Sequence, residues 1–316
     1  MILVSGASGF IGQRLVSQLL LDGHDCRQLV RRPGGKASFV VAELADERAL
    51  AMACSGVESV FHCAGYAHAF ASLDGDDTAK HREVNFEGTR NLVEAAGRAG
   101  VKRFVFLSSV KAMAEPGEQC VDEDFSGQPE TAYGQSKLAA EQAVLEVGRR
   151  YGMHVVNLRL AMVYGSGGRG NLERMGRLVA RRGFPPLPET GNHRSLVHVD
   201  DVISAMRLVA ADDRANGRSY IVAGREAPSG RALYDALRQV QGLPPCRWTV
   251  PAVVLRLAAK TGDGLEKLLG RRLPLDSEAL DRLLGSAWYS PARIERELGW
   301  KARVSLLDGL SEMLRK

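Results

Sequence analysis

The sequence predicts an α/β protein in which a parallel β-sheet, covered by helices on both faces, is joined to a smaller, mainly helical lobe. Over residues 1–160, short apolar runs alternate with helical patterns. The short runs are almost continuously apolar, which is typical of parallel strands buried on both faces. After Tyr164 the alternation ends, and segments rich in glycine and proline begin. The first pattern predicts a doubly wound sheet, and the second predicts a separate lobe.

Strands and helices alternate in chain order. Strands are predicted at residues 2–5, 26–30, 39–41, 59–63, 103–108 and 154–160. Helices are predicted at residues 10–21, 45–53, 84–99 and 133–151. In the third helix, Val84, Leu92, Val93 and Ala96 fall on one broad face, as expected of a helix that covers a sheet.

Two more apolar runs, at residues 196–199 and 219–222, have the pattern of strands that rejoin the sheet. The rest of the chain beyond Tyr164 contains loops and short helical patterns interrupted by glycine and proline. The predicted boundaries are 1–165 and 195–223 for the sheet domain, and 166–194 and 224–316 for a substrate-binding lobe.

The composition excludes several classes of protein. The chain has 316 residues, of which 45% are hydrophobic and 25% are charged, close to the average of globular proteins. The net charge is +5 and the isoelectric point is about 9.0, but no run of five basic residues predicts a nucleic-acid tract. Five cysteines form no C-x-x-C pair, and no histidine cluster stands beside them. We therefore expect reduced thiols and no metal site.

The sequence has no apolar stretch of about 18 residues, so no integral membrane segment is expected. Met1 is followed directly by an apolar strand pattern and glycines, without the charged and apolar regions of a signal peptide. These observations predict a cytoplasmic protein.

A glycine-rich turn follows the first predicted strand, where residues 6–12 read Gly-Ala-Ser-Gly-Phe-Ile-Gly. Glycine allows a sharp turn, close approach of the backbone to a diphosphate and tight packing of the next helix. The N–H groups at the start of that helix attract phosphate. This Rossmann-type pattern predicts a dinucleotide site whose cofactor-binding residues include Gly6, Ser8, Gly9, Phe10, Ile11 and Gly12.

The second predicted strand is followed by Arg31 and Arg32. An acidic residue at this place would bind the adenosine ribose hydroxyls and favour NAD, whereas two arginines can pair with a 2′-phosphate. The alternative interpretation is a solvated turn. NADP(H) is therefore the favoured cofactor, and NAD(H) stays possible.

Tyr133 and Lys137 stand four residues apart at the start of a predicted helix, and therefore on one face of it. A phenol ordinarily has a pKa of about 10, but a nearby ammonium group favours the phenolate. We therefore expect Lys137 to lower the pKa of Tyr133, which would then act as an acid or base. Ser109 follows a strand at the carboxyl edge of the sheet, where its hydroxyl can hold a substrate oxygen.

These motifs together resemble the extended short-chain dehydrogenase/reductase family, in its nucleotide-sugar epimerase/dehydratase branch. The matching segments are G-A-S-G-F-I-G at 6–12, S-S at 108–109, Y-G-Q-S-K at 133–137, L-R-L-A-M-V-Y-G at 158–165, R-S-L-V-H-V-D-D at 194–201 and E-L-G-W at 297–300. The resemblance implies that Ser109, Tyr133 and Lys137 are catalytic, and that Lys137 also binds the nicotinamide ribose. It further implies that Arg194 and Arg282 bind the substrate diphosphate. The remaining cofactor-binding residues that it implies are Glu43, Leu44, Ala64 and Gly65.

Two departures from the family pattern stand close to the cofactor. The usual Gly-Asp-Leu after the third strand is Ala42-Glu43-Leu44 here, so the longer Glu43 would take the place of an aspartate that contacts adenine. The frequent Arg-Pro after the sixth strand is replaced by Arg159-Leu160, so the proline on the nicotinamide side is missing.

Closer similarity points to bacterial reductases that form UDP-N-acetylquinovosamine, through the segments at 162–171, 191–201 and 280–286. It implies NADPH-dependent reduction of the 4-keto group of a UDP-4-keto-6-deoxy-N-acetylhexosamine for surface polysaccharide synthesis. Asn171 and Arg194 would hold the uridine diphosphate, although Asn171 also suits a helix N-cap. The alternatives are a UDP-hexose 4-epimerase with tightly bound NAD, a non-catalytic nucleotide-sensing protein, and a steroid or flavonoid reductase.

The expected partner is therefore a UDP-sugar substrate. The family resemblance also implies a homodimer formed through the helices at 84–99 and 136–151. Residues 250–270 interleave apolar residues with Arg256, Lys260 and Lys267. This pattern predicts either a packed surface helix or a peripheral membrane contact.

Overall fold

A computed structural model of the protein describes residues 1–32, 38–66, 77–168, 170–269 and 277–315. At residues 263–269, 278, 279 and 282 it describes the backbone alone. None of the helices in these ranges is both long and apolar enough to cross a bilayer.

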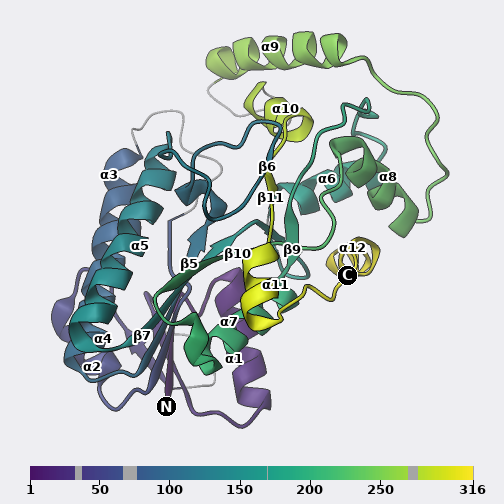
Figure 1. Ribbon diagram of the computed structural model, residues 1–316. Coiled ribbons are helices and arrows are strands. Elements are labelled where there is room, and N and C mark those ends of the chain that lie inside the picture. The colour runs from purple at the N-terminus through teal and green to yellow at the C-terminus, as the bar shows by residue number, and fades with distance from the viewer. Residues whose placement is uncertain (33–37, 67–76, 169, 270–276, 316) are drawn as a thin grey trace.

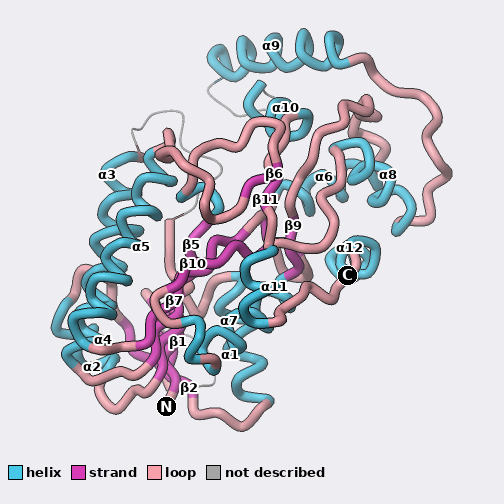
Figure 2. The backbone as a smooth tube through the Cα atoms, in the orientation of Figure 1, coloured by secondary structure: helices cyan, strands magenta, loops and turns pink. Residues whose placement is uncertain are grey.

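Seven parallel strands form the central sheet in the order β10-β7-β5-β4-β1-β2-β3 (Figures 1 and 2). Their bounds are β1 (Ile2–Ser5), β2 (Cys26–Val30), β3 (Phe39–Val41), β4 (Ser59–His62), β5 (Arg103–Ser109), β7 (His154–Leu160) and β10 (Arg218–Val222). From β1 the chain runs outward to β2 and β3, and then crosses back to build the other half from β4. A ligand can bind where the strand order reverses, at the carboxyl ends of β1 and β4. The predicted doubly wound α/β fold is confirmed.

Helices cover both faces of the sheet (Figure 1). They are α1 (Phe10–Leu21) and α7 (Val199–Ala211) on one face, and α2 (Glu47–Cys54), α4 (Gly88–Arg98) and α5 (Ala132–Tyr151) on the other. On the first face Leu15 and Met206 are buried, and on the second Leu92 and Val144 are buried. These apolar faces hold the helices on the sheet because their burial removes them from water.

The helix predicted at residues 84–99 is interrupted. The segment consists of α3 (Thr78–His81), a π-helical turn η1 (Arg82–Glu87) and α4. A π-helical turn is wider than an α-helical one and often occurs at functional sites. The turn contains the buried Asn85. Because the turn is π-helical, the regular α-helical period holds only from Gly88 onward.

Two small sheets lie outside the central one. β8 (Met162–Tyr164) pairs with β9 (Leu196–His198), and β6 (Cys120–Val121) pairs with β11 (Trp288–Tyr289). The prediction that residues 196–199 rejoin the main sheet is wrong. β10 takes the edge position beside β7. The Ala161 N–H donates to the Val222 carbonyl (3.1 Å), so the pairing of these two strands continues until just before β8 begins. β9 then follows β8 in the separate sheet.

The second lobe has a core of its own, which includes Leu187, Leu237 and Leu310. The helices around it are α6 (Asn171–Ala180), α8 (Gly230–Val240), α9 (Ala252–Leu269), α10 (Ser277–Leu284) and α12 (Leu306–Leu314). The helix α11 (Ala292–Leu298) instead joins the core beneath α1 and α7. Two short 3₁₀ turns, η2 (Val110–Ala112) and η3 (Asp213–Ala215), complete the described elements.

Candidate active site

The turn between β1 and α1 has no room for side chains at two of its glycines. Gly6 has a φ of +65°, and a Cβ there would lie 2.6 Å from the backbone nitrogen of Ala64. A Cβ on Gly12 would overlap the carbonyl oxygen of Gly6. The N-cap residue of α1 is Gly9, which supplies no side-chain hydrogen bond to the start of the helix. The turn therefore brings bare backbone and the positive end of a helix together, and these residues fit the diphosphate of a dinucleotide.

A pocket of about 950 Å³ opens beside this turn and is lined in part by Ser8, Arg31, Arg32 and Glu43. The structure thus brings four of the predicted cofactor residues together at the end of β2. Leu44 is not one of the described residues that line the pocket. Its side chain packs against Gly88 of α4 instead. The described walls of the pocket carry two arginines and one carboxylate, a charge that suits a phosphorylated ribose better than a neutral one.

Ser109 and Tyr133 meet at the carboxyl end of β5. Ser109 ends the strand, and its hydroxyl accepts a hydrogen bond from the Lys111 N–H (3.2 Å). Tyr133 lies in the first turn of α5, which Thr131 caps by accepting a bond from the Gly134 N–H (3.1 Å). Ser109 lies close enough to Tyr133 for its hydroxyl to act on the pKa of the phenol. The two side chains therefore come together where β5 ends and α5 begins.

The expectation that Lys137 lowers the pKa of Tyr133 is wrong. Loss of surrounding water raises the pKa of Tyr133 above its usual value, and the nearby Ser109 hydroxyl only partly offsets this. The Lys137 ammonium group donates instead to the Leu107 carbonyl (2.7 Å) and lies 4.5 Å from the centre of the Phe106 ring. The phenol therefore stays protonated at neutral pH and is ready to donate a proton.

Lys137 is itself perturbed by its surroundings. It is buried, and the loss of water lowers its pKa to about 8, although the nearby Glu141 carboxylate acts in the opposite direction. A Cβ on Gly65 would lie 3.6 Å from the Lys137 ammonium nitrogen. Ala64 and Gly65 thus lie between the glycine turn and Lys137, where the resemblance placed the cofactor.

Asn85 is a site residue that the sequence reasoning missed. Its side-chain amide accepts a bond from the Tyr66 N–H (2.7 Å) and donates to the Tyr66 carbonyl (2.9 Å) and to Ser136 (3.2 Å). It thereby fixes the backbone after β4 against α5. In the predicted helix, Asn85 shares a face with the apolar Leu92 and Ala96. A polar residue on the core-facing side of the predicted helix was the feature of the sequence that could have indicated this role.

A buried ion pair lies next to Lys137. Glu141 accepts three hydrogen bonds from Arg159, two at 3.1 Å and one at 2.7 Å, and one from Ser108 at 2.5 Å. Only 3% of the Glu141 side chain is exposed, and 13% of that of Arg159. This pair joins α5 to β7 and β5 directly behind the catalytic candidates.

The predicted substrate residues lie in the second lobe and its connections. Asn171 is exposed and is the first residue of α6, whose N-cap is Gly170, so Asn171 is not the cap. The backbone of Arg194 forms a bridge with Ala287. Arg282 belongs to α10, but its side chain lies outside the described part of the structure.

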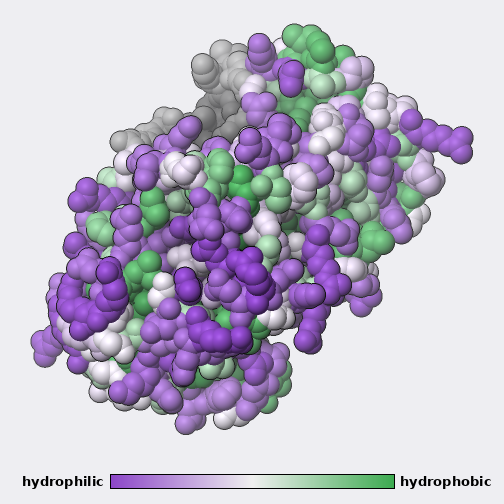
Figure 3. Space-filling model, viewed as in Figure 1, coloured by the Kyte–Doolittle hydropathy of each residue, from purple (hydrophilic) through white to green (hydrophobic). Residues whose placement is uncertain are grey.

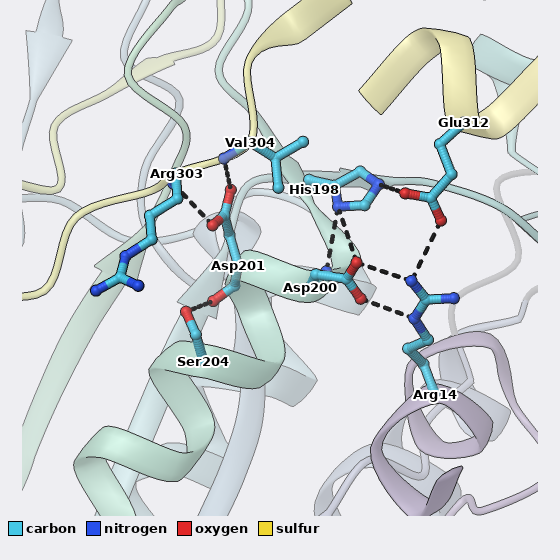
Figure 4. Close-up of polar contacts among 8 residues, drawn as sticks. All are labelled: Arg14, His198, Asp200, Asp201, Ser204, Arg303, Val304 and Glu312. Atoms are coloured by element: carbon cyan, nitrogen blue, oxygen red, sulfur yellow. Dashed lines mark hydrogen bonds and ion pairs between the residues drawn. The ribbon is translucent and has the colours of Figure 1, made fainter. Parts of the chain in front are cut away.

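A polar cluster connects the two parts of the protein (Figure 4). Arg14 of α1 donates to both oxygens of Asp200 (2.7 and 2.8 Å) and to Glu312 of α12 (3.2 Å). His198 caps α7, and its Nε2 lies 3.3 Å from Glu312. Arg14 holds the pKa of Asp200 below its usual value. Because the guanidinium already stands between both carboxylates, we interpret the cluster as structural.

Next to this cluster, Asp201 accepts hydrogen bonds from the N–H groups of Arg303 (2.8 Å) and Val304 (3.1 Å), as Figure 4 shows. These residues lead into α12. The C-terminal helix is thus tied to α7 by Asp201 and to α1 by Arg14.

Comparison with known proteins agrees with this geometry. Residues 2–223 match the model of the "NAD dependent epimerase/dehydratase family". The chain is 30% identical to the UDP-glucose 4-epimerase of Vibrio cholerae, over 98% of this chain and 93% of that protein. It is 27% identical to a 3-beta-hydroxysteroid dehydrogenase of Mycolicibacterium neoaurum, over 99% and 90% of the two chains.

Among solved structures, MoeE5 in complex with UDP-glucuronic acid and NAD is similar, with a TM-score of 0.77 and 25% identity over 99% of this chain and 97% of that one. The family match covers more than half of the sequence and includes both the glycine turn and the residues Ser109, Tyr133 and Lys137. The chain therefore belongs to the NAD-dependent epimerase/dehydratase family, within the extended short-chain dehydrogenases/reductases, and is an enzyme of that type.

Proposed function

We propose that the protein reduces the 4-keto group of a UDP-4-keto-6-deoxy-N-acetylhexosamine, with NADPH as the reductant. The product would be a UDP-N-acetyl-6-deoxyhexosamine of the N-acetylquinovosamine type, used in surface polysaccharide synthesis. The observation that carries the reaction is the protonated, half-buried Tyr133 beside Ser109 at the ligand edge of the sheet. The choice of a UDP sugar is supported by the names of the relatives, one a UDP-glucose 4-epimerase and one bound to UDP-glucuronic acid.

In this proposal the two hydroxyls act on one substrate oxygen. Ser109 holds the carbonyl oxygen of the sugar, and Tyr133 donates its phenolic proton to that oxygen as negative charge develops on it. When bound, the nicotinamide of the dinucleotide supplies the hydride. Lys137 would bind the nicotinamide ribose, while Asn171, Arg194 and Arg282 would hold the uridine diphosphate. Asn85 would keep the backbone beside Gly65 in place for the cofactor.

The direct test supplies UDP-4-keto-6-deoxy-N-acetylglucosamine and follows the oxidation of NADPH and of NADH separately. We expect consumption of NADPH with equimolar formation of the 4-hydroxy sugar, whose configuration NMR would assign. If neither reduced cofactor is consumed, the proposed reaction is rejected.

The preference for NADPH is expected to depend on Arg31 and Arg32. Replacing both by alanine removes charge-assisted hydrogen bonds to the 2′-phosphate, which should raise the KM for NADPH by roughly 10- to 100-fold. The KM for NADH should change little. Arg48→Ala, at an exposed position of α2, is the control. Equal changes for both cofactors would contradict the assignment of the arginines.

The rate of reduction is expected to fall as the pH rises above about 8, the pKa of buried Lys137. Lys137 loses its proton through this range, whereas the raised pKa of Tyr133 keeps the proton donor intact. A profile of kcat/KM should be flat near neutral pH and then fall by about tenfold per pH unit. Lys137→Arg should abolish this falling limb, because a guanidinium stays charged throughout. A limb that persists in this variant would show that another group titrates.

A UDP-hexose 4-epimerase with tightly bound NAD is the second candidate, favoured by the 30% identity to the Vibrio cholerae enzyme. It predicts that NAD copurifies with the protein, and that UDP-glucose and UDP-galactose interconvert without added cofactor. The walls of the pocket at Arg31 and Arg32 favour the reductase over this alternative, since a recycled NAD has no 2′-phosphate to bind.

A further inference from the structure

The outer face of α9 and the segment before it carry large apolar side chains in contact with solvent. The exposed fractions are 64% for Trp248, 66% for Val253, 51% for Val254 and 60% for Leu257. In Figure 3, green atoms gather over this part of α9 at the top of the molecule. The other exposed large apolar residues of the described chain are scattered over several elements, such as Leu21 on α1, Met52 on α2 and Phe39 on β3.

The inner face of α9 explains why the outer face points away from the protein. Leu255 and Ala259 are 2% and 0% exposed and belong to the core of the second lobe, where α9 packs on α10. Val253, Val254 and Leu257 lie on the opposite side of the same turns, because a helix repeats every 3.6 residues. The carbonyl of Trp248 accepts a bond from Arg231 (3.4 Å), so the backbone is held while the indole stays exposed.

Positive charge borders this apolar face. Arg256 and Lys260 are exposed and lie one turn apart along one edge of it, and Arg247 precedes the exposed Trp248. The sequence from 247 to 262 contains these three cations and no aspartate or glutamate. An apolar face with a cationic border and a tryptophan is complementary to the surface of an anionic bilayer.

We propose that Trp248, Val253, Val254 and Leu257, bordered by Arg247, Arg256 and Lys260, form a docking surface for an anionic lipid membrane, on which α9 lies parallel to the bilayer. The apolar side chains enter the interface between head groups and acyl chains, while the cations contact lipid phosphates. The helix does not cross the bilayer, in agreement with the absence of a spanning helix among the described residues. The surface is independent of the proposed reaction, and its test uses no sugar substrate.

The test is sedimentation of the full chain with vesicles of phosphatidylcholine alone and of phosphatidylcholine with phosphatidylglycerol. We expect binding to the anionic vesicles at roughly 50 mM NaCl, and loss of most of it at about 500 mM, where charges are screened. Val253→Ser with Leu257→Ser, and separately Arg256→Glu with Lys260→Glu, should each weaken binding by about tenfold or more.

Matched controls change the same chemistry elsewhere. Leu21→Ser with Met52→Ser removes two apolar side chains that are 81% and 67% exposed, and Arg48→Glu with Lys301→Glu reverses two exposed charges. Both controls should bind vesicles like the unaltered protein. Trp248 fluorescence should shift to the blue on binding, and this shift should be lost in Trp248→Phe, which keeps Trp288 and Trp300.

Three results would overturn the proposal. The first is no binding to anionic vesicles at low salt, and the second is equal loss of binding in the controls. The third is self-association that depends on Val253 and Leu257 in the absence of vesicle binding, which would assign the face to a second copy of the chain.

Discussion

Tyr133→Phe is expected to lower the turnover of the keto substrate by about 100- to 10,000-fold, the range that loss of a positioned proton donor produces. Loss of water around the phenol keeps it protonated beside Ser109, so the variant removes the proton and retains the ring. The ring contact with His81, at 5.5 Å between centres, should persist. Cofactor affinity should therefore be unchanged, which titration of NADPH fluorescence would measure alongside single-turnover rates.

The control is Tyr151→Phe, at the far end of the same helix, where the hydroxyl contacts only the surface Glu94 among the described residues (3.3 Å). This variant should keep full activity. Retained turnover in Tyr133→Phe would refute the proposed proton transfer. A parallel loss of cofactor affinity would show that the hydroxyl serves binding and not chemistry.

Glu141→Ala is expected to lower the free energy of unfolding by about 3–5 kcal/mol, because it leaves the charge of Arg159 buried without a partner. It also removes the acceptor of the Ser108 hydroxyl. The pair is almost inaccessible to water, so solvent cannot replace the lost interaction. Urea unfolding of the ligand-free chain, followed by circular dichroism, would measure the change in the free energy of unfolding. No ligand is needed, because the ion pair lies within the chain itself.

Glu146→Gln tests an exposed ion pair on the same helix. Glu146 pairs with Arg150 at 2.6 Å, but the two side chains are 64% and 50% exposed, so the change should be below about 1 kcal/mol. Replacing both buried partners, as Glu141→Leu with Arg159→Met, should recover much of the lost stability. If Glu141→Ala were no more destabilising than Glu146→Gln, the buried pair would not stabilise the fold.

The central sheet could be predicted closely from the sequence, and the reason is local. Strands such as β1 and β7 are buried on both faces, so each is an apolar run that ends in a turn signal. The strands β6, β8 and β11 have two or three residues each, too few to show a period. Their pairing is decided by distant partners, as the pairing of β8 with β9 shows.

The candidate site could be predicted in its residues more fully than in its electrostatics. Spacing placed Tyr133 and Lys137 on one face of α5, and the structure brings Ser109 to the tyrosine. The direction of the pKa shift was wrong because it depends on burial and on the Leu107 carbonyl, which lies 30 residues before Lys137 in the sequence. The position of Asn85 depends likewise on a π-helical turn that periodicity does not reveal.

The cluster at Arg14 limits how the second lobe can move against the nucleotide-binding half. Rocking of the second lobe as one rigid piece would pull Glu312 away from α1 and uncover His198, whose side chain is 0% exposed. It would also detach the two N–H groups that Asp201 holds before α12. The last helix is therefore held to the nucleotide-binding half by contacts that a rigid displacement of the second lobe would break.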